Sequence, residues 1–397
     1  MRAITIPAPG DPEALQLTEV PTPEIGPDEV LVRVHAAGVN RADLLQRRGF
    51  YNPPPGATDI PGLEISGTIV ALGAEVTGWS VGDRVAALLS GGGYAEEVAV
   101  PAGQLLAVPD TYDLTAAAAL PEVLSTVYSN VVGRGRIRIG EWLLVHGGGS
   151  GIGTAAIQVA NLLGVKIVVT VGSEEKARFC RELGADAVIN YRDEDFVERV
   201  HEICVRPDGT TGADVILDII GAKYLERNIA ALGTDGRLVI IGLQGGTTAE
   251  LDLSTLLQAR KTITATTLRA RPAEQKAEII AEVAAQLWPA VISGDIRPII
   301  HDTVPLAEAA RAHQILEDGD NIGKVLLTVG DEGSGGGEGG AGHAESRGQA
   351  GRSAEEKQSA GETQAAGATQ PTRVTQSAGE AHSAGETQSA GEEGARR

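Results

Sequence analysis

A run of glycines has the composition and spacing of a phosphate-binding turn. It follows the apolar segment 142–145 and His146, and it consists of Gly147, Gly148, Gly149, Ser150, Gly151, Ile152 and Gly153. Glycines allow a tight turn and a close approach of the backbone to a pyrophosphate, and the start of a following helix offers free N–H groups. The segment therefore predicts a dinucleotide site. The strict G-x-G-x-x-G spacing is absent, so a purely structural turn is the alternative.

The segments that flank this turn have the pattern that such a site requires. Apolar residues recur every three or four positions from Ile152 to Leu163, which predicts a helix that Gly164 ends. A second apolar run, Lys166 to Val171, predicts the next strand. Strand, glycine turn, helix and strand together form one parallel crossover unit.

The end of the second strand indicates which nicotinamide nucleotide binds. NAD sites usually place an acid about 20 residues after the turn, where it binds the ribose 2′-hydroxyl. Here the strand end, Thr170 to Ser173 with Gly172 inside it, contains no acid, and Lys176 lies one helical turn further on. We expect NADPH rather than NADH, because a hydroxyl and a cation suit a 2′-phosphate. The alternative makes Ser173 a helix N-cap and places Lys176 on a solvated surface.

Composition divides the chain of 397 residues at residue 331. The segment after it is mostly Gly, Ala, Ser, Glu, Gln and Thr, and Ser-Ala-Gly-Glu recurs at Ser359, Ser377, Ser383 and Ser389. A segment so poor in apolar residues cannot offset its ordering entropy, so we predict disorder over 331–397. The net charge is -20, of which -15 falls on residues 1–330. This acidity argues against nucleic acid and anionic membranes as partners.

Cysteine content and hydropathy exclude other classes of protein. Only Cys180 and Cys204 occur, both on predicted helices, so neither a disulfide framework nor a four-cysteine zinc loop is expected. No apolar run is long enough to span a membrane, and the N-terminus lacks a signal-peptide core. We therefore expect a cytoplasmic, reducing location.

The remaining pattern predicts an α/β chain with two kinds of domain. Residues 1–110 are rich in short strands and turns and lack crossover units, which indicates a mostly antiparallel β-barrel-like domain. A helix broken by Pro121 is expected over 115–132. Strands then alternate with helices, which predicts a doubly wound parallel sheet. Its strands are expected at 142–145, 166–171, 187–190, 215–219, 237–241 and 261–266. A long helix over 272–287 and a strand, helix and strand at 299–304, 307–316 and 325–329 follow.

Several motifs outside the glycine turn match one family. They are Asn40-Arg41-Ala42-Asp43-Leu44 with Gln46, Tyr51 to Ala57, Gly91 to Gly93, Leu144 to Gln158, Gly172-Ser173, Asn190-Tyr191 and Asn321 to Lys324. With these motifs, residues 1–330 resemble the zinc-free NADPH:quinone oxidoreductases of the medium-chain dehydrogenase/reductase superfamily, in particular the branch known from a tumour-suppressor-inducible human enzyme. The resemblance implies a GroES-like catalytic domain (1–120), a Rossmann dinucleotide-binding domain (121–268) and a segment (269–330) that returns to the catalytic domain.

The resemblance also implies that no metal binds. Zinc-dependent members of the superfamily carry a cysteine in the region of Asn40 to Asp43, and Gly-His-Glu where this chain has Gly62-Leu63-Glu64. Both ligands are missing, and the seven histidines have no ligand spacing. Quinone reduction can proceed without a Lewis acid, because a hydroquinone anion is better stabilised than an alkoxide and a hydrogen-bond donor can suffice.

The expected reaction is direct hydride transfer from C4 of the nicotinamide to a quinone, without metal or flavin. By resemblance, Tyr51 donates to the quinone oxygen and Asn40 orients the substrate. Asp43, the third residue assigned to the catalytic group, is better suited to anchoring the loop than to transferring a proton. The alternatives are a packed ring with a wet hydroxyl for Tyr51 and a satisfied loop amide for Asn40.

The resemblance assigns further residues to the cofactor. Thr126 is expected at the nicotinamide end and Tyr191 on the adenosine side, while Asn321 and Lys324 close over the cofactor. Four residues are expected to line the cleft: Gly242, Leu243, Thr267 and Leu268. For Lys324 the alternative is a surface cation before a strand.

Two other functions stay open at this stage. The same hydride geometry would serve an enoyl-thioester or other activated-alkene reductase, and a cofactor-binding protein with little turnover would also keep the glycine turn. The family is usually oligomeric, so we expect a homodimer. The strand Lys261 to Thr266, expected at the edge of its sheet, would join the two copies.

Overall fold

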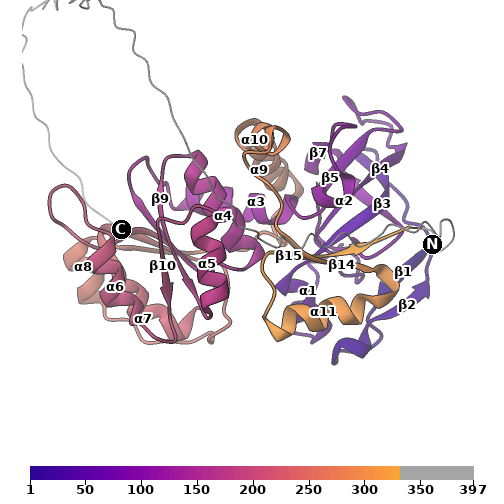
Figure 1. Ribbon diagram of the computed structural model, residues 1–397. Helices are drawn as coiled ribbons and strands as arrows, with labels where there is room; N and C mark the ends of the chain where they lie inside the picture. Colours follow the sequence, from indigo (N-terminus) through magenta and orange to yellow (C-terminus); the bar gives the residue numbers. More distant parts are fainter. Residues whose placement is uncertain (331–397) are drawn as a thin grey trace, which may run out of the picture. The chain divides into compact units, whose positions relative to one another are not determined.

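Two large sheets organise the part of the chain that the structure describes. The computed structural model describes residues 1–330, and the predicted disordered segment 331–397 lies outside them (Figure 1). A seven-stranded and a six-stranded sheet occur in this part, with a separate two-stranded sheet of β1 (Arg2–Thr5) and β2 (Gln16–Glu19). The predicted α/β fold class, with one parallel and one mostly antiparallel sheet, is confirmed.

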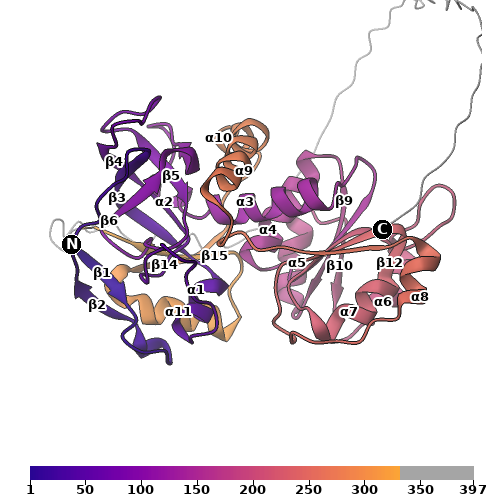
Figure 2. The same ribbon diagram turned by 180° about the vertical axis from the view of Figure 1, so that it is seen from behind.

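The seven-stranded sheet is antiparallel except for one strand pair. Its strands are β3 (Glu29–Val39), β4 (Glu64–Leu72), β5 (Arg84–Leu88), β6 (Glu97–Pro101), β7 (Leu105–Ala107), β14 (Ile300–Pro305) and β15 (Lys324–Thr328). Val30, Val32 and Val34 are buried along β3, which is the alternation of a strand with one face on a core. β15 pairs antiparallel with β3, so the C-terminal strands return to this sheet as expected (Figures 1 and 2).

The six-stranded sheet is parallel throughout. Its strands are β8 (Trp142–His146), β9 (Lys166–Val171), β10 (Ala187–Asn190), β11 (Ala213–Asp218), β12 (Leu232–Ile240) and β13 (Thr262–Ala265). They lie in the order β10-β9-β8-β11-β12-β13, which is the doubly wound order, and all six expected strands are present. Successive strands are added outward from β8 on one side of the sheet and from β11 on the other. Ligands in such sheets bind beyond the strand ends at this switch point.

Helices connect the strands of the two large sheets. They are α1 (Arg41–Arg47), α2 (Leu114–Ala117), α3 (Pro121–Val127), the π-helical η3 (Tyr128–Arg134), α4 (Gly151–Leu162), α5 (Glu174–Glu182), α6 (Phe196–Ile203), α7 (Leu225–Ala231), α8 (Leu253–Ala259), α9 (Ala273–Gln286), α10 (Trp288–Ser293) and α11 (Ala309–Asp318). Pro121 starts α3, because its missing N–H costs nothing at a first helical position. Helix α8 was not among those expected from the sequence, and none of its residues is buried.

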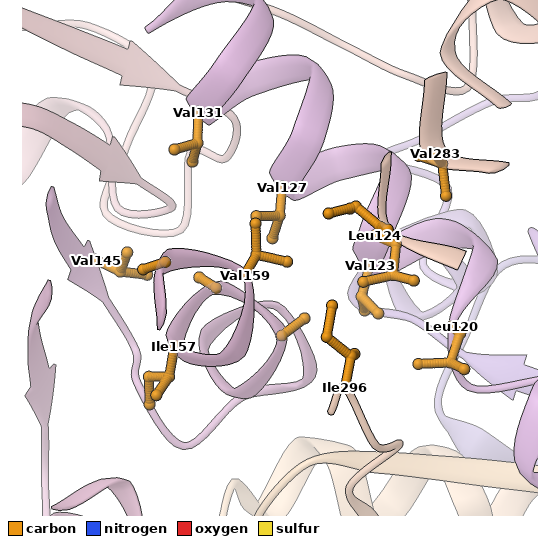
Figure 3. Close-up of a cluster of buried hydrophobic side chains, with 14 of the residues drawn as sticks. Leu120, Val123, Leu124, Val127, Val131, Val145, Ile157, Val159, Val283 and Ile296 are labelled. Carbon is orange, nitrogen blue, oxygen red and sulfur yellow. The ribbon is translucent and has the colours of Figure 1, made fainter. Parts of the chain in front are cut away.

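The parallel sheet is buried on both faces. Leu143 and Val145 pack in a core cluster with α3 and α4, whereas Leu144 of the same strand packs in another cluster with Phe196 of α6. Figure 3 shows Val145 in the first cluster, which also contains Val283 of α9. Burial on both faces explains why the strands of this sheet are continuous apolar runs rather than alternating ones.

Candidate functional site

The glycine turn between β8 and α4 is shaped by close backbone packing. Gly147 has φ +81°, which glycine adopts without strain. A Cβ on Gly153 would lie 2.4 Å from the Gly147 carbonyl oxygen, and one on Gly148 would lie 2.6 Å from Val169 Cγ2. Ser150 caps α4 by accepting from Gly153 N at 3.0 Å. The first turn of α4, with N–H groups that lack intrahelical partners, is therefore reachable by a phosphate.

Residues expected on the adenosine side meet after β9. A Cβ on Gly172 would lie 2.4 Å from the Tyr191 hydroxyl oxygen, so the tyrosine covers this glycine. Ser173 is the N-cap of α5 and accepts from Lys176 N at 3.3 Å. Ser173 thus has the capping role of the alternative interpretation, and it also lies beside Tyr191 and Lys176 at the end of the strand.

Lys176 reaches back over the glycine turn. A Cβ on Gly149 would lie 3.0 Å from Lys176 Cδ. The ammonium donates to the carbonyl oxygen of Gly319, and burial lowers the pKa of this half-buried lysine. Lys176 is therefore half-buried beside the glycine turn, with its ammonium in an exposed hydrogen bond.

The segment before β15 lies on the same turn. Gly323 N donates to the Gly149 carbonyl oxygen at 2.8 Å. Asn321 is buried and donates through its side-chain amide to the carbonyl oxygen of Gly323 at 2.8 Å. A Cβ on Gly151 would lie 2.5 Å from Lys324 Cδ. The structure thus brings Asn321 and Lys324 to the glycine turn, and their closure over a cofactor stays a prediction.

Lys324 is a buried cation, so the alternative of a surface cation is wrong. Its Nζ lies 2.6 Å from Glu64 Oε1 and 2.6 Å from Asn40 Oδ1, and the Lys324 and Glu64 side chains are 6% and 0% exposed. Asn40 Nδ2 also donates to Glu64 Oε1 at 3.0 Å. The amide of Asn40 is satisfied within the protein. This geometry favours a role in holding Glu64 and Lys324 over direct orientation of a substrate.

Asp43 anchors the loop that carries Asn40. One carboxylate oxygen accepts from Asn40 N at 2.8 Å, and the other accepts from Gly62 N at 3.0 Å. The Tyr94 hydroxyl donates to the first oxygen at 3.3 Å. Burial raises the pKa of Asp43 to about 6. Because these donors engage both oxygens, the structure favours the anchoring role over proton transfer.

Tyr51 keeps a hydroxyl that a substrate can reach. Its oxygen lies 3.0 Å from Thr267 Oγ1, and this hydrogen bond is exposed to solvent. Arg269 holds this tyrosine, because its Nη1 donates to the Tyr51 carbonyl oxygen at 3.2 Å and its Cζ lies 5.4 Å from the ring centroid. Arg269 also donates to Gln46 Oε1 at 2.8 Å. The sequence reasoning missed Arg269, since nothing local connects it to Tyr51.

A second carboxylate joins the buried ion pair. Thr126 Oγ1 donates to Glu122 Oε1 at 3.0 Å, and Glu122 N donates to Glu64 Oε2 at 2.9 Å. Burial, followed by the charge of Glu64, raises the pKa of Glu122 to about 7. Its carboxyl group therefore titrates near neutral pH. Glu122 was also missed, although its four-residue spacing from Thr126 on a predicted helix was a usable signal.

Comparison with known proteins agrees with both halves of the fold. Residues 26–110 match the alcohol dehydrogenase GroES-like domain, and residues 151–285 match the model described as zinc-binding dehydrogenase. The quinone oxidoreductase of Rattus norvegicus is 30% identical over 330 residues, which cover 82% of this chain and 97% of the relative. That of Pseudomonas aeruginosa is 35% identical over 321 residues, which cover 80% and 96%.

The chain belongs to the quinone oxidoreductase family of the medium-chain dehydrogenase/reductase superfamily.

A solved structure of this family extends the comparison to three dimensions. Escherichia coli quinone oxidoreductase complexed with NADPH is 30% identical to this chain, with a TM-score of 0.73. The match covers 83% of this chain and 100% of the E. coli chain. The family's fold therefore extends over nearly all of the described residues.

The remaining cleft residues lie at strand ends of this quinone oxidoreductase fold. Gly242 packs against the residue that follows β11, since a Cβ there would lie 2.8 Å from the Ile219 carbonyl oxygen. Leu243 is 54% exposed, and Leu268 packs partly buried against the core. Their contacts with a cofactor stay predictions.

Other side chains of types that often act in catalysis have structural roles here. His146, at the end of β8, is buried between Thr170 Oγ1 at 3.1 Å and Asn228 Oδ1 at 2.7 Å, and burial lowers its pKa to about 4. Burial raises the pKa of Cys180 to about 11. Among residues 1–330, no three His, Cys, Asp or Glu side chains gather as a metal site would require. No helix in this part has the length and apolarity to cross a membrane.

Proposed function

We propose that this member of the family is an NADPH-dependent quinone reductase that works by direct hydride transfer, without metal or flavin. NADPH, when bound, supplies a hydride from C4 of its nicotinamide. The observation that carries the proposal is the glycine turn with Ser173 and the half-buried Lys176 beside an acid-free strand end. The E. coli relative solved with NADPH supports the same cofactor.

The residues around Tyr51 supply what a quinone requires besides the hydride. Reduction of a quinone to a hydroquinone takes up one hydride and one proton. The Tyr51 hydroxyl, paired with Thr267, donates a hydrogen bond to the substrate oxygen as negative charge develops there. The hydrogen bond between Thr126 and Glu122 provides the relay for the proton: the protonated Glu122 carboxyl group gives a proton to the Thr126 oxygen, and the Thr126 hydroxyl gives its own proton to the reduced quinone oxygen. Asn40, Glu64 and Lys324 form one buried unit with Glu122, whose N–H donates to Glu64.

Single-turnover kinetics test this proposal directly. Purified full-length protein, verified to contain neither flavin nor metal, is mixed with NADPH and then with 1,2-naphthoquinone or an enoyl-CoA. Oxidation of NADPH that depends on the quinone supports the proposal. Oxidation with the enoyl-CoA alone would replace quinone reduction by alkene reduction, and tight NADPH binding with neither oxidation would indicate a binding protein.

We also propose a homodimer joined through β13. This strand pairs only with β12 in the described sheet and lies at its edge. The neighbouring α8 exposes Leu253 (69%) and Leu257 (81%), and such apolar residues are typical of an interface. Light scattering that gives a monomer mass removes this proposal. The domain boundaries at 120 and 268 likewise remain proposals.

A further inference from the structure

Two buried cations beside the proposed site lack an acidic partner. Lys276 is 1% exposed, and its ammonium donates to Ser90 Oγ. Arg269 is 4% exposed and donates to uncharged acceptors, including the Ser90 carbonyl oxygen at 2.8 Å. Within residues 1–330, no carboxylate oxygen lies within 4.0 Å of either side chain. Asp43 acts on Arg269 from a longer distance, but no acid acts on Lys276 in this way.

An unpaired buried charge is costly, so Lys276 requires an explanation. Removing an ammonium from water costs several kcal/mol unless an opposite charge compensates it. Burial, followed by the charge of Arg269, lowers the pKa of Lys276 to about 8. The side chain therefore remains mostly protonated at neutral pH. It has three N–H donors, of which Ser90 engages one.

Lys276 lines a groove of about 690 Å³, which is large enough for a small organic molecule. Its wall includes Pro54 and Pro55 of the triple-proline loop and Gly91 and Gly92 of the triple-glycine segment. Both motifs stood out in the sequence, and neither has a role in the proposed reaction. Other parts of the wall come from β6 and the start of α9, among other segments.

The other charged residues of the groove leave Lys276 available. Arg271 is a second lining cation, and its Nε donates to the Thr267 carbonyl oxygen at 2.9 Å. Three acids also line the groove: Glu24, Glu29 and Glu97. Glu29 accepts from Gly26 N at 2.8 Å, and Glu97 accepts from Thr22 Oγ1 at 3.1 Å. None of the three forms an ion pair with Lys276 or Arg271 within the described residues.

We infer that this groove binds a small organic anion, with an apolar body against the proline and glycine segments and one carboxylate, sulfonate or phosphate group on Lys276 and Arg271. An ammonium and a guanidinium offer charge-assisted hydrogen bonds to such a group. None of the residues assigned to NADPH lines the groove. The site is therefore separate from the proposed cofactor contacts.

Calorimetric titration of the full chain, saturated with NADP⁺, tests this site. The probes are 1-naphthalenesulfonate and its neutral counterpart 1-naphthalenemethanol. Lys276→Met is expected to weaken sulfonate binding by roughly tenfold or more and to leave binding of the alcohol unchanged. Lys166→Met is the matched control, since Lys166 lies at the start of β9, where its Nζ is 4.9 Å from the Trp142 ring centroid.

A pH series on the wild type gives a test that needs no variant to fold. The sulfonate stays charged throughout, so its affinity is expected to fall as pH rises through about 8, where Lys276 loses its proton. The other charged groups around Lys276 are Arg269 and the groove residues Arg271, Glu24, Glu29 and Glu97. Lys276→Arg is expected to keep the affinity at high pH. Absence of sulfonate binding, or binding that is indifferent both to Lys276→Met and to pH, overturns the inference.

Discussion

The glycine turn and the cluster around Asn40 lie side by side but are built differently. The turn acts through its backbone: Gly153 and Gly148 leave no room for a Cβ, and the first turn of α4 has N–H groups without intrahelical partners. The cluster acts through side chains from distant segments, with Lys324 held between Glu64 and Asn40. A site formed by backbone depends on the space around its glycines, whereas a site formed by side chains depends on the balance of their charges. Substitutions in the turn should therefore affect nucleotide binding, and substitutions in the cluster should affect stability.

The largest effect is expected in the turn. Gly153→Val places a branched side chain where even a Cβ would lie 2.4 Å from the Gly147 carbonyl oxygen, so NADPH binding should be lost. Gly133→Ala is the control, because its Cβ would meet only the Tyr128 carbonyl oxygen, at 3.9 Å. Fluorescence titration with NADPH measures both variants. Normal binding by Gly153→Val would show that the nucleotide sits elsewhere.

The next largest effect is expected from breaking the buried pair. Lys324→Met leaves Glu64 charged and without its cation, which is expected to lower the free energy of unfolding by about 3 kcal/mol or more. Adding Glu64→Gln should recover part of the loss, because it removes the stranded charge. Urea denaturation measures both proteins. Equal stability of Lys324→Met and wild type would mean that the pair is not buried as described.

A substitution at Tyr51 is expected to change the rate of the reaction without changing cofactor binding. Tyr51→Phe removes the proposed donor to the substrate oxygen and should lower kcat for a naphthoquinone by roughly 100-fold, while affinity for NADPH is unchanged. Tyr128→Phe removes a hydroxyl that binds Glu282 and is the control. Steady-state kinetics with both variants decide the point. An unchanged kcat in Tyr51→Phe would leave the tyrosine as a packed ring with a wet hydroxyl.

The smallest effect concerns Glu122 and depends on pH. A raised pKa means that the folded protein holds this proton up to about pH 7. The stability that Glu122 contributes is therefore present below its ordinary pKa and is lost as pH rises to about 7.

The supply of protons to the substrate should decline over the same range, so wild-type kcat is expected to fall above pH 7. Glu122→Gln should lower kcat by roughly tenfold and remove this pH dependence. A profile that keeps the same inflection in Glu122→Gln would assign it to another group.

The two regions also differ in how far the sequence could predict them. Local periodicity predicted the six parallel strands, the glycine turn and the Ser173 cap, because each depends on neighbours within one crossover unit. The environments of Lys324 and Arg269 could not be predicted in the same way. Lys324 binds Glu64 across more than half the chain, and Arg269 reaches Tyr51 from a different segment. Whether such a cation is solvated or paired is decided only when these segments pack together.

Titration of the wild-type protein with NADPH and NADH tests the central claim most directly. The account predicts that NADPH binds at least roughly tenfold more tightly, because Lys176 and Ser173 meet the 2′-phosphate, and that Lys176→Met removes most of this preference. Equal or tighter binding of NADH would contradict the assignment of the strand end, and binding of neither nucleotide would contradict the site itself.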